Sequence, residues 1–499
     1  MTSTLKHVNR SPWIIAAALM ALFLGALDTL VMSAAMPTII SELGGFNLYA
    51  WSYSSYFLAR AVSLPVFGKL SDLFSTKKLM LFSIGLFVMG SMAAGVSPSM
   101  EFLVAARVFQ GLGAGGIFAL VYVVLFDVSR PGQQAKTLSL AGSIWGIASL
   151  IGPTLGGFIV TWFSWRWIFF INLPLGMISF VGISIYFKDI REKPEQASID
   201  WAGATFLSSF ILGLLTLVMV GGQSLSWSSP QFVFLIFITI FSGYGFYQVE
   251  KNAKDPILDL KFFKYPAFTL GNFIVFCASS AIFSLFAYAP LFLQGVLSKS
   301  PLQVGYAMLS LSLGWSIGSF FIGRVMHRIG PKGAAITGAL LMAIGTSITL
   351  TFSGTTTMTE YFLSFQVAGI GMGFVTLSTL LIVQDSLTIE NLGVATSFHQ
   401  FSRTLGGTIG VGACGGIITA RLTNRLETAG NHLSDELLEN LQERMASLFQ
   451  EEFLSLIPDE TGIFIREVML NSIFQVFVLV FSVTFFILIL TIFLPGRTS

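Results

Sequence analysis

Charged side chains are scarce in this sequence of 499 residues. Asp, Glu, Lys and Arg together make up 10% of the chain, against about 25% in an ordinary soluble domain. Hydrophobic residues make up 54% of it, and the mean hydropathy is +0.79. So few charges cannot cover the surface of a 54.2 kDa protein in water. The composition therefore excludes a soluble protein and predicts a chain that lies mostly in lipid.

Several kinds of functional site are also missing from the sequence. The two cysteines, Cys277 and Cys414, lie inside apolar runs, so no disulfide framework is expected. The histidines have no partners at metal-ligand spacing, and no phosphate-binding Gly-x-x-x-x-Gly-Lys-Ser/Thr loop or nucleophile–base pattern occurs. The net charge is only +2, with no compact basic domain to bind nucleic acid. We therefore expect no enzyme, no metal, no cofactor and no nucleic-acid partner.

Long apolar runs are what the sequence has instead. About fourteen of them are long enough, at ~1.5 Å per residue, to cross a hydrocarbon core of ~30 Å as helices. The first, from Pro12 to Ser33, is too long for the core of a secretory signal and has no clear cleavage site, so we expect it to be retained. The expected spans are residues 12–33, 50–69, 79–97, 101–126, 137–161, 166–187, 203–222, 231–249, 269–294, 303–325, 334–353, 360–384, 397–420 and 468–494.

The distribution of basic residues predicts the orientation of these spans. Of the 27 Lys and Arg residues, 18 fall on one face and six on the other, and Arg60, Arg107 and Arg403 lie within spans. Lys and Arg concentrate in short cytoplasmic loops. Both termini are therefore expected on the cytoplasmic side, which an even number of spans also requires. The expected location is the cell membrane, most simply that of a bacterium.

A short basic motif occurs twice, 255 residues apart. Residues 68–72 (GKLSD) with Lys77 align with residues 323–327 (GRVMH) with Lys332. Each copy follows the second span of a group of six, as duplication of a six-helix unit would give, although any short cytoplasmic loop tends to be basic. We expect a six-helix bundle in residues 1–197, two inserted spans with cytoplasmic linkers in 198–264, and a second six-helix bundle in 265–499.

Further motifs follow a fixed order along the chain. The fourth span contains RVFQG at 107–111, and the fifth contains GPTLGG at 152–157. Together with the loop at 68–78, these motifs resemble the major facilitator superfamily, and GPTLGG resembles the signature of its antiporters. The sequences LDT at 27–29, AMP at 35–37, WRW at 165–167 and NLPLG at 172–176 are similar to the 14-helix drug:proton antiporter branch. The resemblance covers nearly the whole chain and implies an all-α polytopic membrane protein with two six-helix bundles and two inserted central helices.

The fifth-span motif consists of small residues around a proline. Gly152, Gly156 and Gly157 allow a partner helix to come close, and Pro153 favours a kink. In the resembled family this helix packs against the other half and limits leakage. A tight helix contact without a gating role is the alternative. The glycine-rich stretch at 406–416 resembles its partner in the second half. The sequence departs from the fuller family pattern at Ala148, where a glycine is usual.

The cytoplasmic loop that follows the second span carries charges of both signs. In the resembled family this motif stabilises the outward-facing state, and a merely solvated loop is the alternative. Here Leu73 stands where the family usually has Arg, and Ser75-Thr76 where it usually has Gly-Arg. The expected gating residues, whose mixed charges suit pairing with the start of another helix, are Gly68, Lys69, Asp72, Lys77 and Lys78.

Ionisable groups within the spans are the sharpest indication of function, because each costs roughly 2.5 to 3.5 kcal/mol at a helix centre. Asp28 is the one acid well inside a span, and Arg60, Arg107 and Asp28 all fall in the outer half. Burial favours the neutral form of a carboxyl and a nearby arginine favours its charged form. We therefore expect Asp28 to be the protonation site. The resemblance implies proton coupling for Asp28 and Arg107, and a permanent packing pair is the alternative.

Other polar residues in the spans allow two interpretations each. Gln110 lies one turn from Arg107 and either donates to the same site or packs between helices. Arg60 either binds an anionic or zwitterionic substrate group or extends to water. His399 and Arg403 are expected to form a structural clamp opposite the loop acids Asp385 and Glu390.

Residues 422–467 form the one long polar excursion on the outer face. Between 434 and 456 their apolar residues recur at intervals of three and four, which predicts an amphipathic helix. Such a helix could be a lid, a docking surface for an unknown partner, or a segment resting on the bilayer.

The resemblance implies a proton-coupled multidrug efflux antiporter of the kind that confers antibiotic resistance, driven by the proton motive force. Its expected substrates are small lipophilic cationic, neutral or zwitterionic compounds, moved by alternating access. A proton-coupled exporter of a lipid or amphiphilic anion is the alternative. A channel or a membrane enzyme would need a ring of pore-lining groups or clustered acids and histidines, which the sequence lacks.

Overall fold

The computed structural model describes residues 11–129, 134–189, 200–220, 229–253, 260–387, 392–428 and 459–495, and within these ranges the regular elements are all helices. A backbone in lipid must satisfy its own hydrogen bonds, which a helix does locally. The first group of helices is α2 (Ser11–Leu43), η1 (Phe46–Leu48), α3 (Tyr49–Leu73), α4 (Thr76–Gly95), α5 (Met100–Val128), α6 (Gln134–Trp162), α7 (Trp167–Phe170) and α8 (Asn172–Tyr186). The second group is α9 (Trp201–Val220), α10 (Pro230–Asn252), η2 (Leu260–Lys264), α11 (Pro266–Leu291), η3 (Phe292–Val296), α12 (Pro301–Ile348), η4 (Thr349–Thr351), α13 (Met358–Asp385), α14 (Leu392–Thr428) and α17 (Asp459–Ile492).

Several helix starts follow the local sequence. Ser300 caps α12 through the backbone N–H of Gln303, whose side chain accepts from the Ser300 N–H in return. Thr357 and Glu360 form the same reciprocal pair at the start of α13. Each pair satisfies two backbone N–H groups that would otherwise lack a partner at the start of the helix.

Twelve helices in the described residues are long and apolar enough to cross a membrane, and 202–214 forms a shorter apolar helix. The all-α, multi-pass membrane architecture is therefore confirmed. Helix α12 contains two of the expected spans, separated at Gly330 (φ 71°, ψ 168°), where the left-handed φ favours glycine. Helix α3 lies at the expected second span, but its serine- and tyrosine-rich sequence falls outside the twelve. Fourteen spans therefore remain a prediction.

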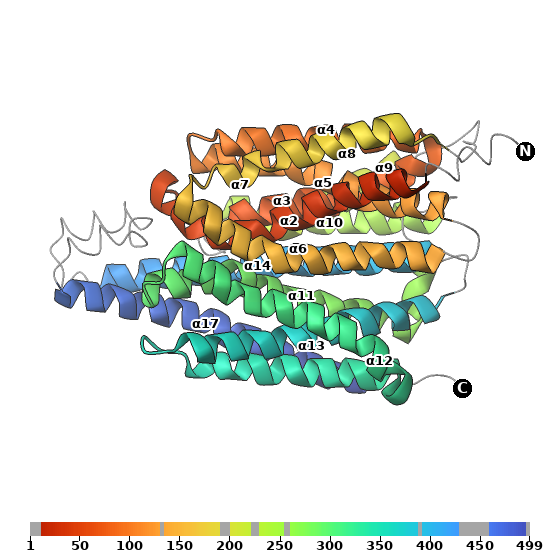
Figure 1. Ribbon diagram of the computed structural model, residues 1–499. Helices are drawn as coiled ribbons and strands as arrows, with labels where there is room; N and C mark the ends of the chain where they lie inside the picture. The colour runs from red at the N-terminus through yellow and green to blue at the C-terminus, as the bar shows by residue number, and fades with distance from the viewer. Residues whose placement is uncertain are drawn as a thin grey trace, which may run out of the picture.

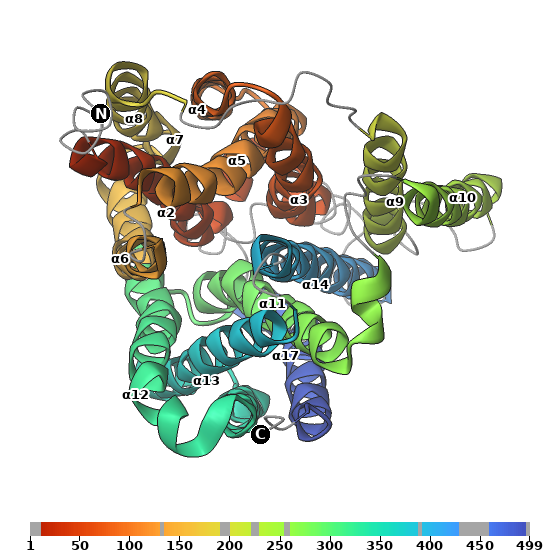
Figure 2. The ribbon, with the colours of Figure 1, turned by 90° about the vertical axis from the view of Figure 1, so that its right-hand side faces the viewer.

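The helices form two groups that meet along one interface (Figure 2). Helices α2 to α8 pack among themselves, with α5 against α3 and α4, and α2 against α6 and α8. Helices α11 to α17 do the same, with α12 against α13 and α11 against α14. The groups join mainly through α3 with α14 and α6 with α12. The boundaries 1–197, 198–264 and 265–499 stay a prediction.

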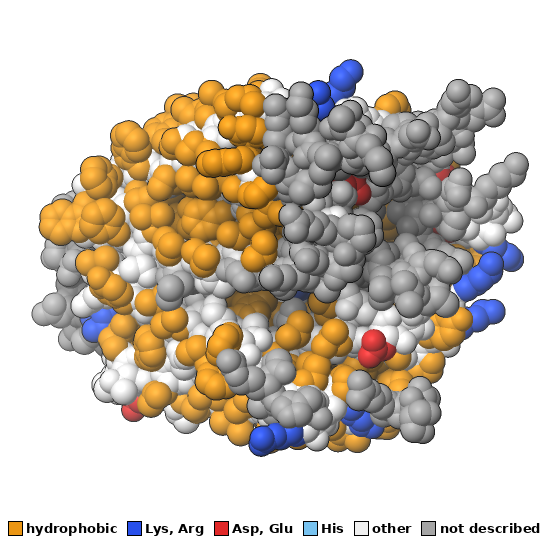
Figure 3. Space-filling model, turned by 45° about the vertical axis from the view of Figure 1, so that its right-hand side comes forward, with side chains coloured by type: hydrophobic (Ala, Val, Ile, Leu, Met, Phe, Trp, Pro, Cys, Tyr) orange, Lys and Arg blue, Asp and Glu red, His pale blue; other side chains and the backbone are white. Residues whose placement is uncertain are grey.

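Helices α9 and α10 form a pair at the side of the bundle (Figure 2). Helix α10 leaves large apolar side chains exposed, among them Phe234, Phe237 and Ile240 at 63%, 64% and 66%. Hydrophobic side chains cover much of the surface in Figure 3, while the visible Lys and Arg side chains lie near its periphery. Such a surface is stable in contact with lipid chains.

Helix α2 begins and helix α17 ends at the same end of the bundle (Figure 1). This agrees with an even number of crossings. That this end is cytoplasmic remains a prediction, and we name the opposite end the outer end on that basis. The expected amphipathic helix at 434–456 lies outside the described residues.

Candidate functional site

Asp28 and Arg107 form an ion pair inside the first helix group. Arg107 Nη1 lies 2.6 Å from Asp28 Oδ2, and the two residues are 1% and 4% exposed. Asp28 lies on α2 and Arg107 on α5, so the pair holds these helices together. The guanidinium also stacks over the ring of Tyr56 from α3, with Cζ 4.0 Å from the ring centroid. The structure thus brings together the two residues expected to take part in proton coupling, and that role stays a prediction.

Two side-chain amides complete the surroundings of Asp28. Gln110 Nε2 donates to Asp28 Oδ1 at 2.7 Å, and Gln110 Oε1 accepts from Arg107 at 2.8 Å. Arg107 and Gln110 are three residues apart, which places them on one face of α5. Asn172 at the start of α8 donates to Asp28 Oδ1 at 3.0 Å and to Ser91 Oγ at 2.9 Å. The carboxylate therefore accepts from three side chains on two helices other than its own.

This cluster is held by charge-assisted hydrogen bonds in a site sealed from water. Gln110 and Asn172 are both 0% exposed. A buried ion pair contributes little net stability, but removal of one partner costs about 3–5 kcal/mol because it leaves an uncompensated charge. A proton added to Asp28 has the same electrostatic effect as such a removal. Protonation at this position would therefore change how strongly α2 is held to α5 and α8.

Arg60 is buried on α3 without an acidic partner among the described residues. It is 3% exposed, and its Nη2 lies 3.4 Å from Thr404 Oγ1 of α14. Its Nε and Nη1 have no hydrogen-bond partner within the described part of the chain. The guanidinium lies over the rings of Phe57 and Phe118, at 4.9 and 5.0 Å. Cation–π contacts contribute about 0.5–2 kcal/mol each. They do not replace the missing hydrogen bonds of Nε and Nη1, so the cost of removing these donors from water stays uncompensated.

Arg403 lies at the interface between the two helix groups, beside two tryptophans. Its Cζ is 5.0 Å from the ring centroid of Trp145 on α6 and 5.9 Å from that of Trp315 on α12. It forms no ion pair with Asp385 in the described structure, and Glu390 lies outside it. The expected clamp is therefore not found for Asp385, and for Glu390 it stays a prediction. Sequence spacing could not reveal that α14 turns this side chain towards two tryptophans.

His399 is the other member of that expected clamp. Its Nε2 lies 3.0 Å from the hydroxyl of Thr379 on α13, and the ring is 1% exposed. The contact joins α13 to α14, so the structural role expected for His399 fits its position although the partner differs.

The fifth-span motif contacts both neighbouring helices of α6. A Cβ added to Gly157 would lie 2.7 Å from the Pro301 carbonyl oxygen of α12, and one on Gly156 would lie 2.5 Å from the Val31 oxygen of α2. Only glycine permits such approach. Gly152 likewise faces Leu30 of α2, and Pro153 lies within the helix. Helix α6 therefore links the first helix of its own group to the second group.

The glycine-rich stretch of α14 has a different packing partner. A Cβ on Gly406 would lie 2.1 Å from the Phe276 oxygen, and one on Gly410 would lie 2.3 Å from the Ser280 oxygen, both on α11. Across the interface, α6 packs against α12. The expectation that 406–416 is the partner of α6 is therefore corrected, because these glycines serve contacts within the second group.

The expected gating loop is mostly helical. Gly68, Lys69 and Asp72 lie on α3, Lys77 and Lys78 lie on α4, and only residues 74–75 link the helices. The Lys77 side chain donates to the Ser184 carbonyl oxygen at the end of α8 at 2.5 Å, and its backbone N–H donates to Asp189 Oδ1 at 3.0 Å. The described contacts thus tie α4 to α8 in the same group. The side chains of Lys69 and Asp72 lie outside the described structure.

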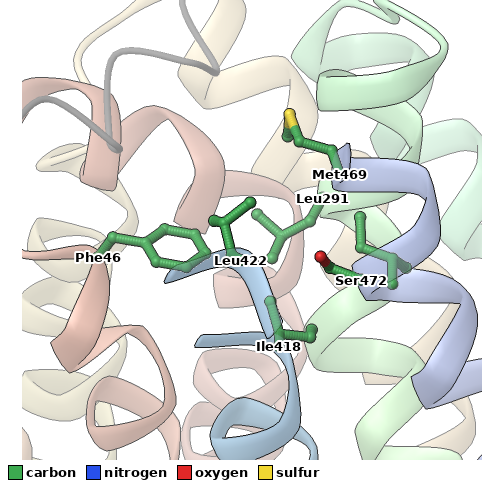
Figure 4. Close-up of a pocket in the computed structure, with 7 residues that line it drawn as sticks. Phe46, Leu291, Ile418, Leu422, Met469 and Ser472 are labelled. Atoms are coloured by element: carbon green, nitrogen blue, oxygen red, sulfur yellow. The ribbon is translucent and has the colours of Figure 1, made fainter. Parts of the chain in front are cut away.

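The outer ends of the two groups are in contact. The Tyr49 hydroxyl of α3 donates to the Ala287 carbonyl oxygen of α11, and the rings of Tyr49 and Tyr288 lie 5.3 Å apart. Beyond them, Phe46 faces α11, α14 and α17 around a small pocket lined by apolar side chains and Ser472 (Figure 4). These contacts join the two groups at the outer end. The pocket has no charged lining residue and is no candidate for binding an ionised group.

Sequence reasoning missed three residues of these polar clusters. Asn172 was recognised only as part of a family motif, although an amide at a helix start is a reasonable donor. Thr404 contacts Arg60 and Trp145 contacts Arg403, and nothing in their local sequence marks them. Their positions depend on which helices face each other, which no local pattern specifies.

Comparisons with known proteins agree with this architecture. The Major Facilitator Superfamily profile matches residues 18–411. The chain is 33% identical over 423 residues to "Multidrug transporter protein MdtP" of Bacillus subtilis, covering 85% of this chain and 77% of that protein. It is 28% identical over 483 residues to "Multidrug resistance protein 3" of the same organism, covering 96% and 94%. "Efflux pump dotC" of Dothistroma septosporum is 30% identical over 402 residues, covering 79% and 69%.

Solved structures of low sequence identity share the fold. A bacterial homologue of the human lysosomal transporter Spinster, in an inward-facing and unoccupied conformation, aligns with a TM-score of 0.65 at 13% identity, covering 98% of this chain and 99% of that one. A D-xylose-proton symporter aligns with a TM-score of 0.58 at 14% identity, covering 90% and 98%.

Proposed function

Because the chain belongs to the major facilitator superfamily and is related to multidrug transporters and efflux pumps, we propose that it is a proton-coupled antiporter of the 14-helix branch. It exports lipophilic small molecules across the cell membrane by alternating access, and its termini are cytoplasmic. The protein is a transporter and not an enzyme. The observation that carries the coupling proposal is the buried cluster of Asp28 with Arg107, Gln110 and Asn172.

Protonation of Asp28 is the proposed coupling step. When Asp28 is ionised, its pair with Arg107 and its bond from Asn172 hold α2 against α5 and α8. A proton removes the negative charge, so the ion pair with Arg107 is lost and the bonds from Gln110 and Asn172 become neutral ones, which are roughly half as strong. Helix α2 also packs against α6 and α12. A weaker hold on α2 therefore reaches the interface between the two groups, where alternating access requires movement.

Two further elements support the proposed cycle. The contacts of Tyr49 and Phe46, which join the two groups at the outer end, fit a stage at which substrate enters from the cytoplasm or the inner leaflet. The contact of Gly157 with α12 supplies a close pivot between the groups. The residues at 68–78 keep their proposed gating role, with Lys77 joining α4 to α8.

The test uses purified protein in liposomes that contain a pH dye, with an imposed proton gradient and a panel of lipophilic cations, neutral compounds and anions. Wild type, Asp28→Asn and the control Glu101→Gln are compared, the control being an exposed acid at the start of α5. We expect substrate-dependent proton movement in wild type and Glu101→Gln, and its loss in Asp28→Asn. Exchange of substrate in wild type without proton movement would refute antiport. Coupled transport that survives in Asp28→Asn would make the Asp28–Arg107 pair a packing contact.

A further inference from the structure

Two arginines and a stack of aromatic rings occupy the interface between the helix groups. Arg60 lies over Phe118, the rings of Phe118 and Trp145 stack with centroids 5.5 Å apart, and Arg403 lies over Trp145. The Thr404 hydroxyl, next to Arg403 in the chain, lies 3.4 Å from Arg60 Nη2. In Figure 2, α3 and α14, which carry the two arginines, face each other across this interface.

These two arginines are not neutralised within the described protein. Neither forms an ion pair there, and Arg60 Nε and Nη1 are buried donors without a partner. Asp28 is the buried acid of the first helix group, but both its oxygens already accept from Arg107, Gln110 and Asn172. The interface thus has an excess of positive charge and of hydrogen-bond donors.

We propose that the substrates of this transporter carry an oxyanion, a carboxylate or a phosphate, which binds between Arg60 and Arg403 while an apolar body lies along Phe118, Trp145 and Phe57. Guanidinium groups match planar oxyanions with two parallel donors, and Arg60 has two donors unused. The surrounding rings suit an apolar tail. This proposal names the substrate class of the proposed exporter. It rests on the proposed function in one respect, namely that substrates pass along this interface.

An anionic substrate has an electrical consequence. Exchange of one incoming proton for one outgoing monovalent anion moves two positive charges inward per cycle. The same exchange moves one charge for a neutral compound and none for a monovalent cation. A membrane potential that is negative inside therefore drives anion export most strongly. Transport of an anion should accelerate when such a potential is imposed, and transport of a monovalent cation should not.

The first experiment measures binding with the full chain in phosphatidylcholine nanodiscs. The probes are a dansyl-labelled long-chain carboxylate, its methyl ester and the amine of equal chain length. The variants are Arg60→Gln, Arg403→Gln and Arg60→Lys, and the control is Arg421→Gln, which removes an exposed arginine of α14. Elution volume in size-exclusion chromatography and the thermal midpoint confirm that each variant is folded.

We expect wild type and Arg421→Gln to bind the carboxylate at least about tenfold more tightly than the ester or the amine, as charge-assisted hydrogen bonds imply. Arg60→Gln and Arg403→Gln should each lose this preference while ester binding changes less than about twofold. Arg60→Lys should retain part of it. Equal binding of the three probes to wild type overturns the proposal, as does a variant that weakens all three probes equally.

Two further measurements identify the source of the oxyanion and distinguish a failure of the oxyanion site from a failure of the antiport proposal. Adding phosphatidylglycerol to the nanodiscs competes with the probe if a lipid headgroup is the natural oxyanion, and leaves binding unchanged if a soluble amphiphile is. Proton-driven export of a neutral compound without carboxylate preference would refute the oxyanion site and leave antiport intact. Carboxylate preference without proton movement would refute antiport and leave the oxyanion site intact.

Discussion

Replacing Arg107 by methionine should destabilise the protein in a manner that depends on pH. The substitution keeps an apolar side chain of similar length beside Tyr56 and removes the charge that lies 2.6 Å from Asp28. Asp28 then keeps only the amides of Gln110 and Asn172 as partners. Breaking a buried pair from one side costs about 3–5 kcal/mol.

The variant can avoid this cost by keeping Asp28 protonated in the folded state. An ordinary aspartate in water has a pKa of about 3.9, so holding it protonated at pH 7 costs about 4 kcal/mol, and at pH 5 about 1.5 kcal/mol. The folded variant then binds one proton more than the unfolded chain, so its stability rises as the pH falls. Relative to wild type, Arg107→Met should recover roughly 2–3 kcal/mol between pH 7 and pH 5.

The assay is thermal or denaturant unfolding of wild type, Arg107→Met and the double variant Asp28→Asn/Arg107→Met in one detergent at pH 5, 6 and 7. Asparagine at position 28 keeps an acceptor for Gln110 and Asn172 and carries no charge. The double variant should therefore be more stable than Arg107→Met at pH 7 and should lack its pH dependence. A single variant as stable as wild type at pH 7, or a double variant no better than the single, would refute the view that Arg107 compensates a buried charge.

Three further predictions follow from contacts in the structure. Asn172→Leu should lower the stability by about 1–3 kcal/mol in unfolding experiments, because it removes a donor to a buried carboxylate; unchanged stability would contradict this. Gly157→Val should lower both the thermal midpoint and the transport rate, because even a Cβ would lie 2.7 Å from a backbone oxygen of α12, whereas Gly85→Ala, which meets nothing within 4 Å, should leave both unchanged. Glu42→Gln should lower the free energy of unfolding by less than about 1 kcal/mol, and high salt should remove this difference from wild type, because the Glu42 and Arg166 side chains are 48% and 30% exposed. A larger loss of stability that salt does not reduce would contradict this.

The fold could be predicted from the sequence because each membrane helix corresponds to a long apolar run in the chain. Long apolar runs and the positions of Lys and Arg are sufficient to place most spans, and the structure has a helix at each expected position in the described residues. The second span is the one of these helices that hydropathy marks least clearly, because α3 carries Arg60 together with many serines and tyrosines. Its place in the fold depends on the neighbours that cover those groups.

The site could be predicted only where it contains residue types that are rare inside membrane spans. Asp28 and Arg107 stand out because ionisable groups inside spans are costly, and the structure places them in contact. The partners of Arg403 were not predictable, because its two tryptophans come from α6 and α12, far away in the chain. Which residues meet across the interface depends on how two helix groups are docked, and no periodicity within one helix contains that information.

The Asp28–Arg107 pair and the buried Arg60 lie on either side of one aromatic ring, that of Tyr56. The sign of these charges restricts how a proton on Asp28 can be coupled to substrate binding. Tyr56 lies 4.0 Å from the Arg107 guanidinium carbon and 5.7 Å from that of Arg60. A proton on Asp28 leaves Arg107 uncompensated and makes the region more positive, which would favour a bound oxyanion. Simple competition between proton and substrate for one charge therefore suits a cation exporter and does not suit an oxyanion. An exporter of oxyanions with this arrangement has to couple through movement, and the contacts of α2 with α5, α6, α8 and α12 supply a path from the protonated carboxyl to the interface.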